Sequence, residues 1–166
     1  ILRWGVSEID ESYLKRAHAV CPVTAVENVY NMIRREHEAL IPTLEENGIG
    51  WVAHGPMFKG LLTAAFQKDV QFARDDWRGR LVNRRNLDRY HLLLEYLKQL
   101  GKEKGATPAQ LSLAWVLHRK PYIVPIPGMR SVERLEENAR SEEISFTADE
   151  IKRIDHLVKE ADEHND

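Results

Sequence analysis

The sequence contains a single cysteine, Cys21, so no disulfide can form within the chain. A lone thiol is typical of proteins kept in a reducing compartment, and the cytoplasm is the simplest location to expect. No apolar run approaches the ~20 residues that a membrane span requires, so no membrane partner is predicted. The first residues resemble neither a signal peptide nor a cationic transit peptide.

Neither sign of charge dominates, because 24 Lys and Arg stand against 26 Asp and Glu, for a net charge of -2. This balance gives no electrostatic reason to expect a nucleic-acid partner. The patterns GxGxxG and GxxxxGK[ST] are absent, so neither a Rossmann site nor a P-loop is predicted. The histidines are scattered, with no pair at a convincing metal-ligand spacing, and we expect no metal.

Short apolar runs alternate with segments of helical periodicity along the chain. The expected strands are residues 2–6, 23–26, 49–53 and 122–126, and the expected helices are 10–20, 35–47, 86–100, one from 107, 131–140 and one from 147. Apolar strands that alternate with helices indicate a parallel sheet covered by helices. No linker divides the chain, so residues 1–166 are predicted to form one domain. Four strands fit either an open doubly wound sheet or half of an eight-stranded barrel.

The segment from His54 to Arg85 breaks this alternation and is predicted to be a long loop. Gly55-Pro56 and Gly60 punctuate its start, and its second part is strongly charged. A loop of this length in a compact domain is usually functional or mobile. Lys59 could be a phosphate partner or a solvated loop lysine, and we favour the solvated interpretation. We interpret the charged part as mobile.

Residues 128–134 have the composition of an anion site. Ser131 is predicted to cap a helix, whose free N–H groups favour an anion. Gly128 allows the backbone to approach a ligand closely, and Arg130 and Arg134 add cations suited to phosphate. The alternative is a solvated helix start that carries ordinary surface charges.

Several segments, in order along the chain, resemble the aldo-keto reductases. They are GVSEIDESYLKRAHAV, VTAVENVYNMIRREHEALIPTLEENGIGWVAHGPMFKGLLTAAF, TPAQLSLAWVLHRK and IVPIPGMRSVERLEEN. The resemblance extends over nearly the whole chain and matches strands five to eight, the C-terminal half of the family's barrel. It implies an α/β fold of parallel strands alternating with helices, half of a TIM (β/α)8 barrel. It also implies an NADPH-dependent reductase of small aldehydes or ketones, with cofactor at the C-terminal ends of the strands.

The resemblance implies two groups of cofactor contacts. The adenine and phosphate end would be held by Pro56, Gly60, Leu61, Ile126, Gly128, Met129, Arg130, Ser131, Arg134, Glu137 and Asn138. The nicotinamide end would be held by Ser7, Glu8, Glu27, His54 and Gly55. This second end departs from the family pattern, which has Asn, Gln, Tyr and Ser at the last four positions.

The resemblance places the family's catalytic Tyr, Lys, Asp and His on the first four strands, so no catalytic residue is predicted here. We expect this chain to be inactive alone, as the cofactor-holding half of a reductase. The alternative is a non-catalytic half barrel that serves as a nucleotide-binding or assembly module. In either case two free sheet edges and an uncovered inner face call for the N-terminal half or a second copy. Whether NADP(H) binds to this half alone stays open.

Overall fold

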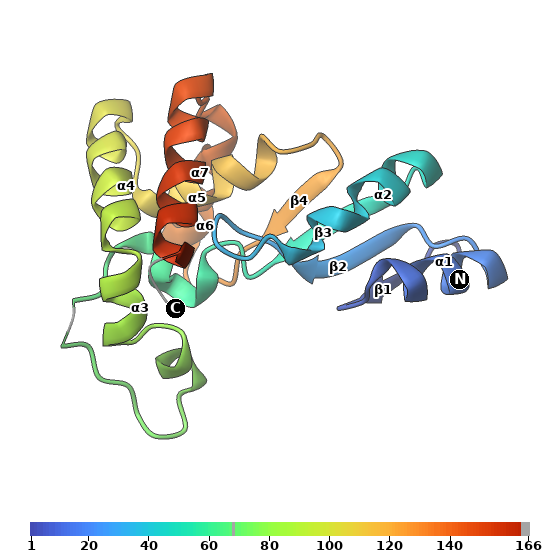
Figure 1. The fold of residues 1–166 in the computed structure, drawn as a ribbon, viewed down its shortest axis with the longest axis horizontal. Helices are drawn as coiled ribbons and strands as arrows, with labels where there is room; N and C mark the ends of the chain where they lie inside the picture. Colours follow the sequence, from blue (N-terminus) through green and yellow to red (C-terminus); the bar gives the residue numbers. More distant parts are fainter. Residues whose placement is uncertain (68, 164–166) are drawn as a thin grey trace.

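A computed structural model describes residues 1–67 and 69–163. Four parallel strands form one sheet in the order β1-β2-β3-β4, as shown in Figure 1. Their bounds are β1 (Gly5–Ser7), β2 (Ala25–Val29), β3 (Gly50–His54) and β4 (Ile123–Ile126). Each neighbouring pair is joined through at least one helix, which is the βαβ connection that parallel strands require.

The sheet has one covered face and one uncovered face. Val26, Trp51 and Ile123 are at most 1% exposed and form the outer face, beneath the helices. Because side chains alternate along a strand, the neighbouring residues face the other side. On that inner face Val124 is 54% exposed and Ile126 is 45% exposed.

Seven α-helices occur in the described residues. They are α1 (Glu11–Val20), α2 (Ile41–Asn47), α3 (Arg84–Arg89), α4 (His91–Lys104), α5 (Pro108–Leu117), α6 (Val132–Ala139) and α7 (Ala148–Glu163). Figure 1 shows α4, α5 and α7 gathered beyond β4, while α1 lies beside β1 at the opposite end. No helix in the described part of the chain is both long and apolar enough to cross a membrane.

Aromatic side chains form the centre of the core on the outer face. The ring of Tyr30 lies between Trp51 at 4.6 Å and Trp115 at 5.5 Å, measured between ring centroids. The guanidinium groups of Arg35 and Arg119 stack on Trp115 at 4.6 Å and 4.9 Å from the ring centroid. Stacked rings and cations of this kind add to the stability that apolar burial provides.

Two predicted elements differ in extent from the structure. The first strand is Gly5–Ser7, and Leu2, which was predicted to lie in this strand, is outside it and 99% exposed. The reason is that β1 is an edge strand whose ladder with β2 begins only at Gly5. The helix predicted over 35–47 is a 3-10 turn (Glu36–Leu40) followed by α2, with Pro42 in the first turn, where proline is tolerated.

The predicted long loop contains local structure. Two 3-10 helices, η2 (Phe58–Thr63) and η3 (Trp77–Arg80), lie within it, and α3 begins at Arg84. In Figure 1 the chain from residue 69 to α3 extends away from the sheet in green.

Helix α7 is fixed to three separate parts of the molecule by ion pairs. Asp155 contacts Arg35 at 2.7 Å, and Glu150 contacts Lys104 at 2.9 Å. Asp162 accepts from Arg89 at 2.7 Å. The helix therefore ties the segment after β2 to the C-terminal end of α3 and to the C-terminal end of α4.

Candidate functional site

A cleft of about 1200 Å³ lies at the C-terminal ends of β3 and β4. Its walls come from the segments after these strands, the first turn of α5, one side of α6, and the segment around Trp77. The C-terminal ends of barrel strands are where TIM-barrel sites lie. The cleft brings together His54, Gly55, Pro56, Gly60, Ile126, Gly128, Met129, Arg130, Arg134, Glu137 and Asn138.

The remaining predicted residues lie at the edge of the cleft or outside its lining. Ser131 caps α6, and its hydroxyl oxygen accepts from the Arg134 N–H at 3.3 Å. Leu61 is fully buried, so only its backbone could reach a ligand. Ser7, Glu8 and Glu27 lie on or beside β1 and β2.

The start of α6 favours negative charge. A backbone N–H in its first turn and the Ser131 hydroxyl lower the pKa of the Glu133 carboxyl. This is the effect expected of unpaired N–H groups at a helix N-terminus. Arg130 stands beside this turn and has no hydrogen bond or ion pair among the residues described. At longer range its charge adds to that of Arg78, the main cause, in lowering the pKa of the Asp76 carboxyl.

The other predicted cation, Arg134, is already paired. Its Nη1 donates to Glu137 Oε2 at 2.6 Å, and the Thr107 hydroxyl donates to Glu137 Oε1 at 2.8 Å. Gln110 donates to the Glu137 backbone oxygen at 2.8 Å. Glu137 therefore links the first turn of α5 to α6 and fixes the distance between two walls of the cleft.

Part of the segment that was predicted to be mobile, around Trp77, lines one wall of the cleft. Lys59 Nζ lies 4.2 Å from the centroid of the Trp77 ring, and Asp76 and Arg78 form an ion pair beside it at 2.5 Å. Lys59 is therefore a partner of an aromatic ring, rather than the solvated lysine that we predicted. The sequence signal was an isolated Trp within a charged run, which periodicity does not detect.

The backbone after β3 adopts unusual conformations next to the cleft. Phe58, Lys59 and Ala64 have φ values of 46°, 57° and 53°, in the left-handed region. Gly60 has a φ of 101°, and a Cβ there would lie 3.0 Å from the Phe66 ring. Residues other than glycine rarely adopt a left-handed φ, so three of them in one segment indicate that contacts with the surrounding structure hold it in place. Such conformations are common at ligand sites.

Glu8 and His54 form a pair across the ends of β1, β2 and β3. Glu8 Oε1 lies 2.7 Å from His54 Nε2 and accepts from the Val29 N–H at 2.7 Å. Partial burial opposes ionisation of Glu8, but the His54 and Val29 hydrogen bonds outweigh it and lower the pKa of this carboxyl. Glu8 holds this position with a φ of 49°, which is uncommon for a residue other than glycine, Asn or Asp.

Asn28 is a further residue at these strand ends, and the sequence patterns did not single it out. It is fully buried, and its side chain bonds the backbone N–H and C=O of Ile9 at 3.3 Å and 2.8 Å. Its Nδ2 also lies 3.0 Å from His37 Nδ1. Asn28 therefore anchors the chain after β1, and with it the backbone that carries Glu8.

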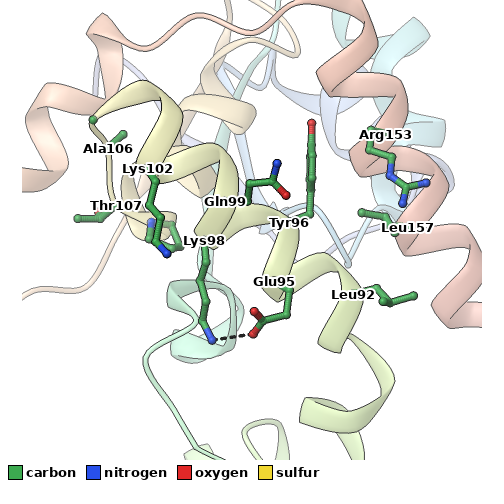
Figure 2. Close-up of a pocket in the computed structure, with 13 residues that line it drawn as sticks. Leu92, Glu95, Tyr96, Lys98, Gln99, Lys102, Ala106, Thr107, Arg153 and Leu157 are labelled. Carbon is green, nitrogen blue, oxygen red and sulfur yellow. Dashed lines mark hydrogen bonds and ion pairs between the residues drawn. The ribbon is translucent and has the colours of Figure 1, made fainter.

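A second hollow lies between α4 and α7, away from the strand ends, as Figure 2 shows. It measures about 780 Å³, and Leu92 and Tyr96 on α4 face Arg153 and Leu157 on α7. Its lining consists of helix and loop residues, most of which are exposed or partly exposed. No group of three or more His, Cys, Asp or Glu that could hold a metal occurs among the residues that the structure describes.

Comparisons with known proteins agree with this architecture. The model of the aldo/keto reductase family matches residues 1–159. The aldo-keto reductase str7 of Strobilurus tenacellus is 33% identical over 95% of this chain and 49% of its own length. A thermostable aldo-keto reductase solved with the inhibitor epalrestat is 27% identical, with a TM-score of 0.69 over 93% of this chain and 48% of its own. A glycerol dehydrogenase from Gluconobacter oxydans has a TM-score of 0.85 at 23% identity, over 94% of this chain and 48% of its own.

The fold is thus that of half a TIM barrel, with a cleft at the C-terminal ends of its strands. The chain belongs to the aldo/keto reductase family. It spans about half the length of the relatives that it matches.

Proposed function

We propose that this chain holds NADP(H) for a cytoplasmic oxidoreductase that reduces small aldehydes or ketones. The observation that carries the proposal is the cleft, which joins the unpaired Arg130 and the start of α6 to the strand ends. Helix N-terminal N–H groups together with an arginine suit a phosphate group. Bound NADPH would supply the hydride, and this chain would hold the adenine and phosphate end.

Arg130 is the residue that we expect to select NADPH over NADH. Arg134 already pairs with Glu137, whereas Arg130 has no such partner among the described residues. An arginine that gains a charged acceptor contributes about 1.5–3 kcal/mol, which corresponds to a factor of about 10 to 100 in affinity. Arg134 and Glu137 would instead maintain the shape of the wall.

The opposite end would meet the nicotinamide. Glu27 and the Ser7 hydroxyl lie side by side on β2 and β1, and Ser7 Oγ donates to the Glu27 backbone oxygen at 2.9 Å. A carboxylate accepts from the amide N–H2 but does not donate to its oxygen. Glu8 would fix the His54 ring rather than contact the cofactor, since its Oε1 is already engaged.

Fluorescence titration of the chain with NADPH and NADH tests the proposal. The chain should bind NADPH at least about tenfold more tightly, and Arg130→Ala should remove that preference while leaving NADH affinity unchanged. Arg140→Ala, an exposed arginine at the C-terminal end of α6, is the matched control. Equal affinities for the two nucleotides, or no binding of either, would contradict the proposal.

The general acid for carbonyl reduction would come from outside this chain. No tyrosine lines the described part of the cleft, and Tyr30 is fully buried in the core. We therefore expect the chain alone to leave NADPH unoxidised when it is mixed with a panel of aldehydes. Turnover by the chain alone would contradict this part. The alternative is a nucleotide-binding module. It would be favoured if a complex that completes the barrel bound NADPH but did not oxidise it when a carbonyl compound was added.

A further inference from the structure

Glu27 is an unpaired carboxylate on the inner face of the sheet. It is exposed in the middle of β2, and its side chain makes no hydrogen bond or ion pair with any residue that the structure describes. Its neighbours in register are Ser7 on β1 and Val52 on β3, and Val124 follows on β4. Residues in register on neighbouring strands point to the same face, so this row holds one charge and no cation to offset it.

The charged groups closest to this row are already engaged with one another. His54 lies on the inner face, one step beyond Glu27 toward the C-terminal ends of the strands, and its Nε2 lies 2.7 Å from Glu8 Oε1. Arg34, which lies within electrostatic reach of Glu8, forms an ion pair with Glu36. Lysine and arginine are absent from β1 to β4, all of which the structure describes. The charge of Glu27 is therefore uncompensated.

The strand ends thus carry opposite charges at their two sides. Arg130 and the start of α6 make the β4 side positive, and Glu27 makes the β1–β2 side negative. A nicotinamide dinucleotide has its phosphates toward one end and its nicotinamide ring at the other. The ring is uncharged in NADPH and carries one positive charge in NADP+, so the oxidised form matches both ends of the site.

We infer that Glu27 makes the chain bind NADP+ more tightly than NADPH, and that it thereby makes bound NADPH a stronger hydride donor. This inference rests on the proposed function, which places the nicotinamide beside Glu27. A glutamine, which the family pattern has at this position, offers the same reach without the charge.

The reaction creates the charge that Glu27 favours. A hydride leaves the nicotinamide ring of NADPH with its electron pair and bonds to the carbonyl carbon, while the carbonyl oxygen takes a proton from the acid outside this chain. The ring becomes positive in this step, so a fixed carboxylate beside it favours the product side. By linkage, the ratio of the two dissociation constants equals the factor by which binding shifts the hydride-transfer equilibrium.

Isothermal titration calorimetry of the chain at neutral pH tests the inference with three ligands: NADP+, NADPH and adenosine 2',5'-bisphosphate. The wild-type chain should bind NADP+ at least about threefold more tightly than NADPH, since solvent screens the exposed carboxylate and keeps the effect modest. Glu27→Gln should abolish this preference, and Glu27→Asp, which keeps the charge, should retain it. The bisphosphate lacks the nicotinamide, so its affinity should be the same in all three chains.

Glu46→Gln is the matched control, because Glu46 lies exposed on α2, away from the inner face, and it should keep the wild-type preference. Equal affinities of the wild-type chain for NADP+ and NADPH would overturn the inference alone, provided that the bisphosphate binds. A preference that persists in Glu27→Gln would overturn it as well, because the charge of Glu27 would then not be its cause. If no nucleotide binds, the proposed function fails, and the inference fails with it.

Discussion

The two faces of the four-stranded sheet differ although the same strands form both. On the outer face Trp51 is 1% exposed and packs against Tyr30, beneath the helices. One residue further along β3, Val52 points to the inner face and is only partly buried. The outer face therefore holds the fold together, while the inner face and the strand ends beside it are left free for other molecules. Alternate residues of one strand thus belong either to the buried core or to the uncovered face.

The largest expected effect comes from truncating the outer face. Trp51→Ala should lower the free energy of unfolding by about 3–5 kcal/mol, because it removes a buried indole and leaves a cavity against Tyr30. Val52→Ala, on the same strand but on the inner face, should cost less than about 1 kcal/mol. Urea unfolding followed by circular dichroism measures both. Equal costs for the two variants would show that the inner face is packed, and the comparison would then fail.

A smaller difference is expected between two glycines of the cleft. Gly60→Ala should cost about 1–2 kcal/mol, since its φ is 101° and the new Cβ would press on the Phe66 ring. At Gly128 a Cβ would meet no described atom within 4 Å, so Gly128→Ala should leave stability within about 0.5 kcal/mol of wild type.

The Gly128 variant should still weaken NADPH binding in the fluorescence titration, because the methyl group projects into free space beside the cleft. Wild-type affinity of Gly128→Ala would mean that no ligand approaches the backbone there. A loss of stability as large as that of Gly60→Ala would show instead that this glycine is structural.

Local patterns predicted the parts of the fold that depend on neighbours in the sequence. The helix expected from residue 107 is present, and it begins with a capping box in which Thr107 and Gln110 make both hydrogen bonds. The parallel sheet was predicted from apolar runs separated by helices, and it is confirmed. The helical segment expected over 35–47 ends as its range predicted, with Gly48 after it at a left-handed φ of 61°.

Contacts between distant residues were beyond such patterns. Glu8 and His54 are 46 positions apart, and their hydrogen bond depends on which strands are neighbours and on a left-handed backbone at Glu8. The contact between Lys59 and Trp77 depends on how the segment after β3 folds back, which no periodicity encodes. The resemblance to a family indicated the residues around the cleft. The hydrogen bonds that Arg134 and Glu8 already make depend on side-chain conformation, which no sequence pattern encodes.

The smallest expected effect concerns the pH dependence of stability at the strand ends. The folded pKa of Glu8 lies below its ordinary value of 4.5. Its contribution to stability is therefore fully present above about pH 4.5 and is lost as the pH falls through the lower folded value. Glu8→Gln should flatten the fall in melting temperature over this range, whereas Glu46→Gln on exposed α2 should follow the wild-type curve. The difference should be small because the Glu8 side chain is 52% exposed. Parallel curves for wild type and Glu8→Gln would mean that the bond to His54 is not formed in solution. The C-terminal ends of the strands would then be less firmly held than the helix-covered outer face.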